Sequence, residues 1–204
     1  MQALHLYRTI AQQAEAYVNE KSSKFYAFSY PVTSEEEVAA HLKQLRQVYP
    51  DANHHCSAYV LGAQGLQHRA SDDGEPSGSA GKPILHAIQS LGLTDTMVVV
   101  VRYFGGKQLG VRGLIDVYNL AALQVLEASI IVERELGQQI QFHYRYEQEP
   151  FVQRLWKKFS LKPESHQPDM TGILVQVKVP LAQVDHVVSE TKSISDEVEI
   201  GPIR

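Results

Sequence analysis

Apolar and polar residues follow strand-like patterns at three places in the first two thirds of the chain. The aromatic-rich segment Lys24–Val32 and the shorter segment Cys56–Leu61 are both typical of strands. The strongest pattern is Thr96–Phe104, a continuous β-branched run of the kind found in strands that are covered on both faces. We therefore expect Thr96–Phe104 to be the central strand of a sheet.

Apolar residues spaced by three and four positions predict three helices, one in each interval that follows these strands. Pro50 ends the first helix, and Pro83 and Gly92 bound the second. The predicted buried stripes are Val38, Leu42, Leu45 and Val48 in the first helix, Ile84, Leu85, Ile88 and Leu91 in the second, and Leu114, Val117, Tyr118, Ala121, Val125 and Ala128 in the third.

Between the second strand and the second helix, the segment Gly62–Gly81 is rich in Gly, Ser, Asp and Pro and predicts one long loop. Loops longer than about 12 to 15 residues are uncommon in compact domains and are often functional. This segment is therefore the first candidate for a functional site.

The last third of the chain has a different order of elements. Its patterns predict strand, helix, strand, strand, helix and strand at Gln138–Tyr146, Glu149–Phe159, Leu161–His166, Thr171–Val179, Leu181–Thr191 and Val198–Ile203. This βαββαβ order is that of a ferredoxin-like domain. We expect an α+β protein with two domains, residues 1–134 and 135–204.

Composition and charge restrict the classes of function. The 204 residues are 44% hydrophobic and 21% charged, which is typical of a folded globular protein. The formal net charge is −4, and the part before Glu135 is no more basic than the part after it. Because nonspecific nucleic-acid binding depends on phosphate neutralisation, only a local basic patch would serve that purpose.

The single cysteine, Cys56, excludes an internal disulfide and any zinc site with several cysteines. The first residues lack the apolar stretch of a signal peptide, and the longest apolar run, Met97–Val101, is too short to span a membrane. We expect a soluble cytoplasmic protein without membrane contact.

Two segments have compositions that packing alone does not require, and each of them joins a strand to a helix. They are Arg69–Pro83 (RASDDGEPSGSAGKP) and Arg102–Leu114 (RYFGGKQLGVRGL). Because loops at the same ends of strands gather at one edge of a sheet, we expect the two segments to form one surface.

The second of these segments combines glycines with cations. Gly105, Gly106, Gly110 and Gly113 would let backbone amides turn toward an anion, and Arg102, Lys107 and Arg112 add positive charge. The alternative is a strand-to-helix connection that simply needs glycine dihedral angles. Neither segment meets a nucleotide-binding fingerprint, since Pro76 and Pro83 break the P-loop pattern, so we expect no ATP, NAD or other cofactor.

Other residue clusters suggest catalysis more weakly. Asp72, Asp73 and Glu75 would bind a divalent cation or act as acid and base, but such residues also cap turns or pair with Arg69, Lys82 or the basic loop. His54 and His55 point to opposite faces of a strand and would not share a metal ion. Cys56 is most simply a small buried hydrophobic residue, and Ser77 and Ser79 do not form a nucleophile elbow.

Three ordered stretches resemble the signature blocks of the IMPACT family: His54–Gly62 (HHCSAYVLG), Arg69–Pro83 and Arg102–Tyr118 (RYFGGKQLGVRGLIDVY). The resemblance implies that the first domain has the fold of a ribosomal-protein domain and of domain IV of elongation factor G. The second domain is similar to that of the bacterial YigZ-like branch and to domain V of the same factor. It also implies a role in translation, because eukaryotic relatives restrain a stress pathway that phosphorylates an initiation factor.

One block departs from the family pattern, in which G-G-L-[VI]-[RK]-A-Y is usual. Here Arg112 stands in place of a glycine, and Asp116 takes a position that is often basic. These two changes alter the geometry expected for a bound anion, although Lys107 and Arg112 keep the segment positive.

Three functions remain as hypotheses. The first is a non-enzymatic protein that contacts RNA, the ribosome or a translation factor through the two loops, with oligomeric state open. The second is a metal-assisted hydrolase of a phosphorylated small molecule that uses Asp72, Asp73 and Glu75, and the third is a protein-interaction module that depends on Tyr103 and Phe104. For the first, the predicted ligand-binding residues are Arg69, Ser71, Asp72, Asp73, Gly74, Glu75, Ser77, Gly78, Ser79, Gly81, Lys82, Arg102, Tyr103, Gly105, Gly106, Lys107, Gly110, Arg112 and Gly113.

Overall fold

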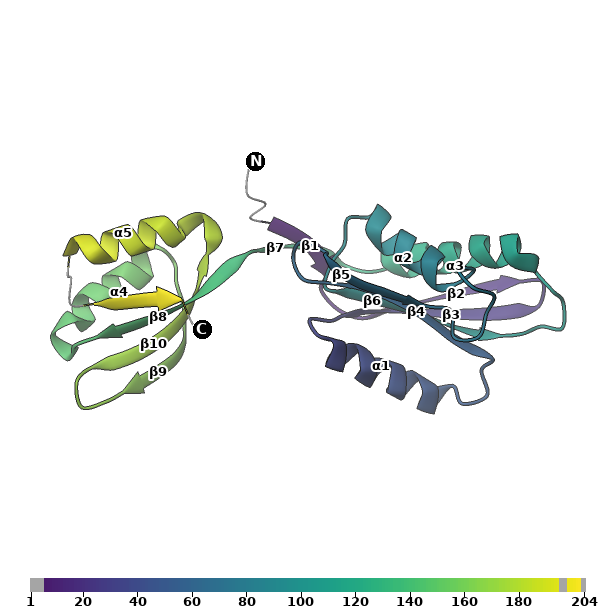
Figure 1. Cartoon of the computed structure of the whole chain (residues 1–204), viewed down its shortest axis with the longest axis horizontal. Coiled ribbons are helices and arrows are strands. Elements are labelled where there is room, and N and C mark those ends of the chain that lie inside the picture. Colours follow the sequence, from purple (N-terminus) through teal and green to yellow (C-terminus); the bar gives the residue numbers. More distant parts are fainter. Residues whose placement is uncertain (1–5, 195–197, 203–204) are drawn as a thin grey trace. The chain divides into compact units, whose positions relative to one another are not determined.

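A computed structural model describes residues 6–194 and 198–202 of the chain. The chain divides into two compact units, of which one spans Tyr7–Arg134 and the other consists of the residues from Glu135 onwards together with Leu6. Both units combine helices with a sheet (Figure 1). The expected α+β fold is confirmed.

The first unit is built on an antiparallel five-stranded sheet with the strand order β2-β3-β6-β4-β5. The strands are β2 (Ala14–Glu20), β3 (Ser23–Pro31), β6 (Thr96–Tyr103), β4 (His54–Leu61) and β5 (Gln67–Ser71). The prediction that the β-branched run is the central strand is confirmed, because β6 lies between β3 and β4 and is buried along almost its whole length.

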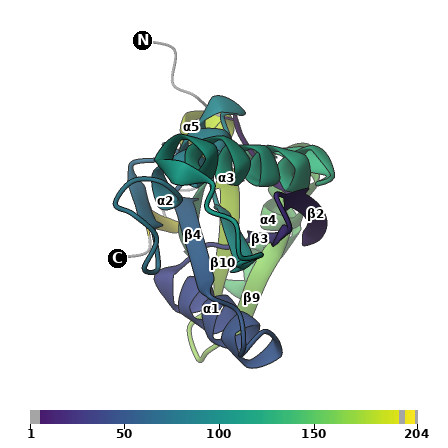
Figure 2. The same ribbon diagram turned by 90° about the vertical axis from the view of Figure 1, so that its right-hand side faces the viewer.

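Helices cover both faces of this sheet. Figure 2 shows α2 (Gly81–Ser90) and α3 (Gly110–Glu127) on one side of β4 and α1 (Glu35–Val48) on the other. Helix α1 begins where it does because Ser34 caps it, accepting a bond from the Glu37 amide at 3.3 Å. One apolar cluster fills the space under α2 and α3, and a second fills the space under α1.

The structure corrects several predictions for this unit. The expected loop Gly62–Gly81 is interrupted by β5, whose sequence QHRAS holds a single apolar residue and therefore has no strand pattern. Strand β2 and the short strand β1 (Leu6–Ile10), which pairs with β7 (Ile131–Glu135), were not predicted. Two residues placed in buried stripes are exposed, Val48 in the last turn of α1 and Ala128 just beyond α3.

The second unit has the predicted ferredoxin-like topology. Its elements in chain order are β8 (Gly137–Tyr144), α4 (Glu149–Lys158), β9 (Pro163–Pro168), β10 (Ile173–Pro180), α5 (Val184–Ile194) and β11 (Glu199–Pro202). They form an antiparallel sheet of order β11-β8-β10-β9, with one core cluster beneath both helices. The last residue of the predicted final strand, Ile203, lies outside the described residues.

Candidate functional site

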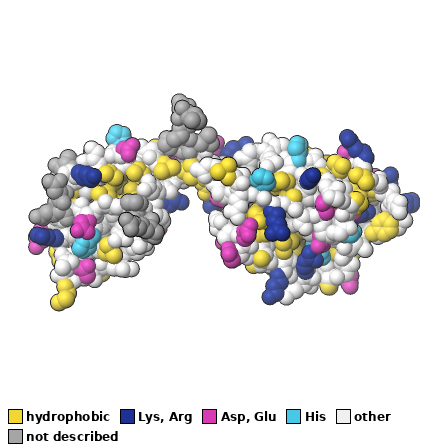
Figure 3. All heavy atoms as spheres, viewed as in Figure 1, with side chains coloured by type: hydrophobic (Ala, Val, Ile, Leu, Met, Phe, Trp, Pro, Cys, Tyr) yellow, Lys and Arg dark blue, Asp and Glu magenta, His cyan; other side chains and the backbone are white. Residues whose placement is uncertain are grey.

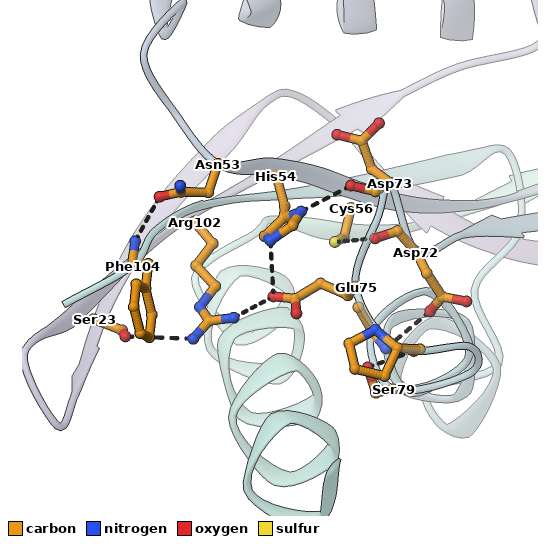
Figure 4. Close-up of polar contacts among 12 residues, drawn as sticks. Ser23, Asn53, His54, Cys56, Asp72, Asp73, Glu75, Ser79, Arg102 and Phe104 are labelled. Atoms are coloured by element: carbon orange, nitrogen blue, oxygen red, sulfur yellow. Dashed lines mark hydrogen bonds and ion pairs between the residues drawn. The ribbon is translucent and has the colours of Figure 1, made fainter. Parts of the chain in front are cut away.

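The two segments singled out in the sequence meet at one end of the five-stranded sheet. Strand β5 is antiparallel to β4, and β4 is antiparallel to β6, so β5 and β6 run in the same direction. The loop 72–80 after β5 and the turn 104–109 after β6 therefore leave from the same edge, as predicted. Figure 4 shows side chains from both segments in contact with each other.

A buried ion pair joins the two segments. The Arg102 guanidinium donates to Glu75 Oε1 at 2.5 Å, and the Tyr118 hydroxyl donates to the same oxygen at 2.8 Å. The side chains of Arg102 and Glu75 are only 6% and 4% exposed. The prediction that Arg102 contacts a ligand phosphate is therefore wrong, because its charge is already paired and buried.

Asp72 occupies the N-terminus of α2 with its own carboxylate. Its Oδ1 accepts from the amides of Ala80 at 3.0 Å and Gly81 at 2.8 Å, and its Oδ2 accepts from the Gly78 amide at 2.8 Å. Burial alone would raise the pKa of Asp72, but these three backbone donors outweigh burial and lower it. The anion-binding position at the N-terminus of α2 is thus occupied by the carboxylate of Asp72.

Asp73 faces the opposite way and binds α1 and β4 (Figure 4). Its Oδ1 accepts from Arg46 at 2.6 Å, and its Oδ2 accepts from the backbone amide of His55 at 2.6 Å. The Asp73 carbonyl lies 2.8 Å from Nδ1 of His54, which must carry the proton because a carbonyl only accepts. The Asp73 backbone is left-handed, with φ of 44°. The contacts of its side chain with α1 and β4 hold this strained conformation in place.

The acidic loop, residues 72–80, therefore uses its carboxylates for contacts within the protein and does not gather them into one cation-binding site. Asp72, Asp73 and Glu75 each have different partners, and their carboxylates point in different directions (Figure 4). Among the described residues, no group of three His, Cys, Asp or Glu side chains is placed to hold a metal ion. Of the alternatives weighed for these carboxylates, capping is seen for Asp72 and pairing with the basic segment is seen for Glu75, whereas Asp73 pairs with Arg46 and not with Arg69 or Lys82.

Cys56 lies beneath this network and is fully buried. Its thiol is 3.0 Å from the Asp72 carbonyl and 3.3 Å from the Tyr118 hydroxyl oxygen. Burial raises the pKa of Cys56 to about 12, so the reactive thiolate is disfavoured at neutral pH. His54 and His55 do face opposite sides of β4, as predicted, with His54 toward Glu75 and His55 among the residues beside α1.

The turn 104–109 is fixed from two sides. The Phe104 amide donates to the Asn53 side chain at 2.8 Å, and the Gly105 amide donates to Ser23 Oγ at 3.1 Å. A Cβ on Gly105 would lie 2.1 Å from the carbonyl carbon of Ser22, so only glycine allows this approach to the β2–β3 hairpin. The hairpin tip and the turn are consequently neighbours.

Exposed cations surround this turn. Lys107 is exposed on the turn itself, and Lys21 and Lys24 are exposed on the adjoining hairpin, with Lys24 paired in register to Tyr103. Phe104 is 47% exposed, and the buried Arg102 guanidinium lies 5.5 Å from the centre of its ring. Figure 3 shows Lys or Arg and hydrophobic side chains together at this end of the unit. We call Lys21, Lys24, Phe104 and Lys107 the turn patch.

The predicted trio of Arg102, Lys107 and Arg112 does not converge. Arg102 is buried, whereas the Arg112 side chain is 87% exposed and pairs with Asp116 at 3.3 Å within α3. Lys21 and Lys24 were missed because the β2–β3 hairpin was not predicted. The signal for them was the sequence KSSK, two lysines that flank a turn between two strands.

The remaining predicted residues fall in several places. On the acidic loop Gly74 and Ser77 are exposed, whereas Ser79 is buried and donates to the Pro76 carbonyl at 2.6 Å. Beside it, Gly78 and Lys82 line a cavity of about 390 Å³ between α2 and α3. Gly106 and Gly110 have positive φ, Gly113 is half-buried in α3, and Tyr103 is half-buried against Tyr26.

Arg69 and Ser71 do not belong to the surface of the turn. Both lie on β5 and line a separate cleft against α1. The prediction of one continuous surface from Arg69 to Gly113 is therefore wrong at its first end, because β5 turns these two side chains to the α1 face of the sheet.

Comparison with known proteins adds a family and a fold. Residues 21–126 match the family model described as the Impact N-terminal domain. The IMPACT family member YvyE of Bacillus subtilis is 38% identical over 133 residues, which cover 65% of this chain and 61% of YvyE. The IMPACT family member YigZ of Escherichia coli is 41% identical over 108 residues, which cover 52% of this chain and 53% of YigZ.

A crystal structure of a hypothetical protein shares the fold along the whole chain. It has 27% sequence identity and a TM-score of 0.77, with 99% of both chains covered. Within the described residues, no helix has the length and apolar character needed to cross a membrane.

Proposed function

The chain belongs to the IMPACT family, and on that basis we propose that it is a non-enzymatic, translation-associated protein that binds single-stranded RNA through the turn patch. The observation that carries this proposal is an exposed aromatic residue, Phe104, on a turn that also holds the exposed Lys107 and that packs against the hairpin carrying the exposed Lys21 and Lys24. Aromatic rings accept stacked bases, and cations beside them neutralise the phosphates that follow.

The acidic loop supports this surface from below. Glu75 holds Arg102 under the Phe104 ring, where the guanidinium faces the ring at 5.5 Å. Asp72 and Asp73 fix the rest of the loop to α2 and α1. The loop thereby keeps Phe104 in one orientation, and a preoriented ring loses less entropy when a base stacks on it.

The charge of the whole chain shapes the expected affinity. With a net charge of −4, the protein has no general attraction for polyanions, so binding would rest on the local patch. Glu20, exposed beside Lys21 on the same hairpin, reduces the local field. We expect modest affinity that falls steeply with salt.

A metal-assisted hydrolase is the weaker alternative. Its three proposed ligands have separate partners, and the nearby thiol of Cys56 is buried with a pKa of about 12. This geometry supports binding rather than hydrolysis.

The direct test is fluorescence anisotropy with a labelled single-stranded oligoribonucleotide of random sequence at low salt. Phe104→Ala should weaken binding by about 5- to 150-fold, since stacking contributes about 1 to 3 kcal/mol per base. Lys24→Glu/Lys107→Glu should also weaken it, whereas the control Lys43→Glu, an exposed lysine on α1, should not. Equal affinity in all four proteins, or no binding by the wild type, would overturn the proposal.

A further inference from the structure

A concave surface on the second unit gathers cations around the end of α4. Its volume is about 570 Å³. It is lined by residues of α4 and of the turn that follows the helix: Gln153, Arg154, Trp156, Lys157, Ser160, Leu161 and Lys162. No acidic residue is among them, and none of them belongs to the turn patch or to the first unit. We call this surface the α4 concavity.

The three cations of the concavity have no acidic partner. Arg154, Lys157 and Lys162 are all exposed. Their side chains form no ion pair or hydrogen bond within residues 6–194 and 198–202. The neighbouring Lys158 behaves differently, because its ammonium group pairs with Glu190 at 2.7 Å. The charge of the concavity is therefore left for an anion from outside the chain.

The acids nearest in sequence have partners of their own. Glu149 accepts from Gln153 Nε2 at 2.7 Å through Oε1, and its Oε2 is buried. Glu164 accepts from Gln139 on β8 at 2.8 Å. Residues 135–204 hold eight Lys and Arg against ten Asp and Glu. The concavity is thus a local basic patch on a unit that is acidic as a whole.

Helix stability explains only one of the three cations. A cation in the last turn of a helix stabilises the helix dipole, which accounts for Lys157. Arg154 lies before that turn, and Lys162 lies beyond the end of α4. Between them, Ser160 has a left-handed backbone with φ of 54°, a conformation in which glycine is usual after a helix. A serine at this position keeps a hydroxyl group on the wall of the concavity.

The lining residues fit the sugar–phosphate backbone of RNA better than a protein partner. Arginine, lysine, serine and glutamine side chains are common donors to phosphate oxygens, and the concavity holds all four types. Protein interfaces instead have an apolar core that is poor in lysine. None of the large exposed hydrophobic residues in the described part of the chain lines the concavity, and its Trp156 and Leu161 are only 5% and 7% exposed.

The tryptophan of the concavity is not available to stack on a base. The Trp156 ring packs edge-on against Phe142 in the core, with ring centres 5.0 Å apart. The contacts left to the concavity are those with phosphates, which carry no sequence information. The turn patch differs in this respect, because Phe104 is exposed there.

We propose that the α4 concavity is a second RNA-binding site, which holds phosphates of the RNA backbone without reading the bases. Arg154, Lys157 and Lys162 neutralise phosphates there, and Ser160 donates a hydrogen bond to a phosphate oxygen. RNA as the partner rests on the proposed function, but no residue of the turn patch takes part, so either site can fail alone.

The salt dependence of binding measures the contribution of the concavity. The full chain is titrated against a labelled single-stranded oligoribonucleotide and followed by fluorescence anisotropy. Lys157→Gln/Lys162→Gln should make the slope of log Kd against log salt concentration shallower by about 1.4, at about 0.7 per phosphate contact. The matched control Lys178→Gln/Lys192→Gln removes the same charge from exposed positions outside the lining and should keep the wild-type slope. The change should be equal for oligo-A and oligo-U, because the bases are not read.

Nuclear magnetic resonance separates this site from the turn patch. In the isotope-labelled full chain, the oligoribonucleotide should shift the backbone amide signals of residues 153–162. These shifts should persist in Phe104→Ala/Lys107→Glu, and a turn patch that binds no RNA would then overturn the proposed function while leaving the α4 concavity as an RNA site.

Three results would overturn the second site. The first is an absence of shifts at residues 153–162, and the second is a wild-type salt slope in Lys157→Gln/Lys162→Gln. The third is displacement of the RNA from these residues by oligoglutamate of equal charge as readily as by unlabelled RNA, which would mark the concavity as a site for acidic protein segments.

Discussion

Replacement of Glu75 by glutamine tests the role of the buried ion pair. The substitution keeps the shape of the side chain but removes the negative charge that faces Arg102. Because both side chains are almost fully buried, at 4% and 6% exposure, the Arg102 cation cannot regain water without opening the loop. Tyr118 also loses the charged acceptor for its hydroxyl.

The expected loss of unfolding free energy follows from the burial of the Glu75 and Arg102 side chains. Removal of one partner from a buried ion pair typically costs about 3 to 5 kcal/mol, and because the glutamine amide still accepts one hydrogen bond, we expect the lower end, about 3 kcal/mol. With an m-value of about 1 to 3 kcal/mol per molar urea, the urea concentration at the midpoint of unfolding should fall by about 1 to 3 M. Single domains are commonly stable by only about 5 to 15 kcal/mol, so this is a large fraction.

Urea unfolding followed by circular dichroism measures this effect. Asp116→Asn, which breaks the exposed pair with Arg112, is the matched control and should cost less than about 1 kcal/mol. The double variant Glu75→Gln/Arg102→Met should recover much of the loss, because no uncompensated charge remains buried. An unchanged midpoint for Glu75→Gln, or a double variant as unstable as the sum of two independent losses, would refute the reasoning.

Three further predictions concern the same end of the sheet. Gly105→Ala should lower stability by about 1 to 3 kcal/mol in thermal unfolding, since its Cβ would meet the Ser22 backbone at 2.1 Å; equal stability would mean that the turn does not approach the hairpin. The lowered pKa of Asp72 means that its carboxylate stabilises the fold fully above the unfolded pKa of about 3.9 and loses this effect as pH falls through the folded value. Asp72→Asn should accordingly flatten the acid limb of a stability profile between about pH 5 and pH 2, and an unaltered profile would contradict the capping role. Cys56, buried and with its pKa raised to about 12, should resist iodoacetamide at pH 8 in the native protein and react only after unfolding, as intact-mass spectrometry would show.

The sequence was informative wherever burial dictated residue type. Thr96–Val101 is covered on both faces, so these positions are apolar or small, and the run was recognisable as a central strand. The helices and the ferredoxin-like order were found for the same reason. Edge strands gave no such signal, because β5 is exposed at nearly every position and β2 presents small alanines to the core between polar residues.

The candidate site was predictable in position but not in the roles of its residues. Composition located the acidic loop and the Gly-rich turn, and the direction of the strands brought them together. Whether Arg102 is a ligand contact or a buried partner of Glu75 depends on the face of β6 that it occupies and on the depth of its burial. A single sequence does not reveal that depth. The lysines of the hairpin were missed because the β2–β3 hairpin was not predicted, and it is the close backbone approach at Gly105 that brings this hairpin beside the turn.

The most direct test of the central claim is the slope of log Kd against log salt concentration for single-stranded RNA. If Lys24 and Lys107 each neutralise one phosphate, the slope of Lys24→Glu/Lys107→Glu should be shallower than that of wild type by about 1.4, at about 0.7 per contact. The same slope for both proteins, with wild-type affinity in the variant, would show that RNA does not bind at the turn patch.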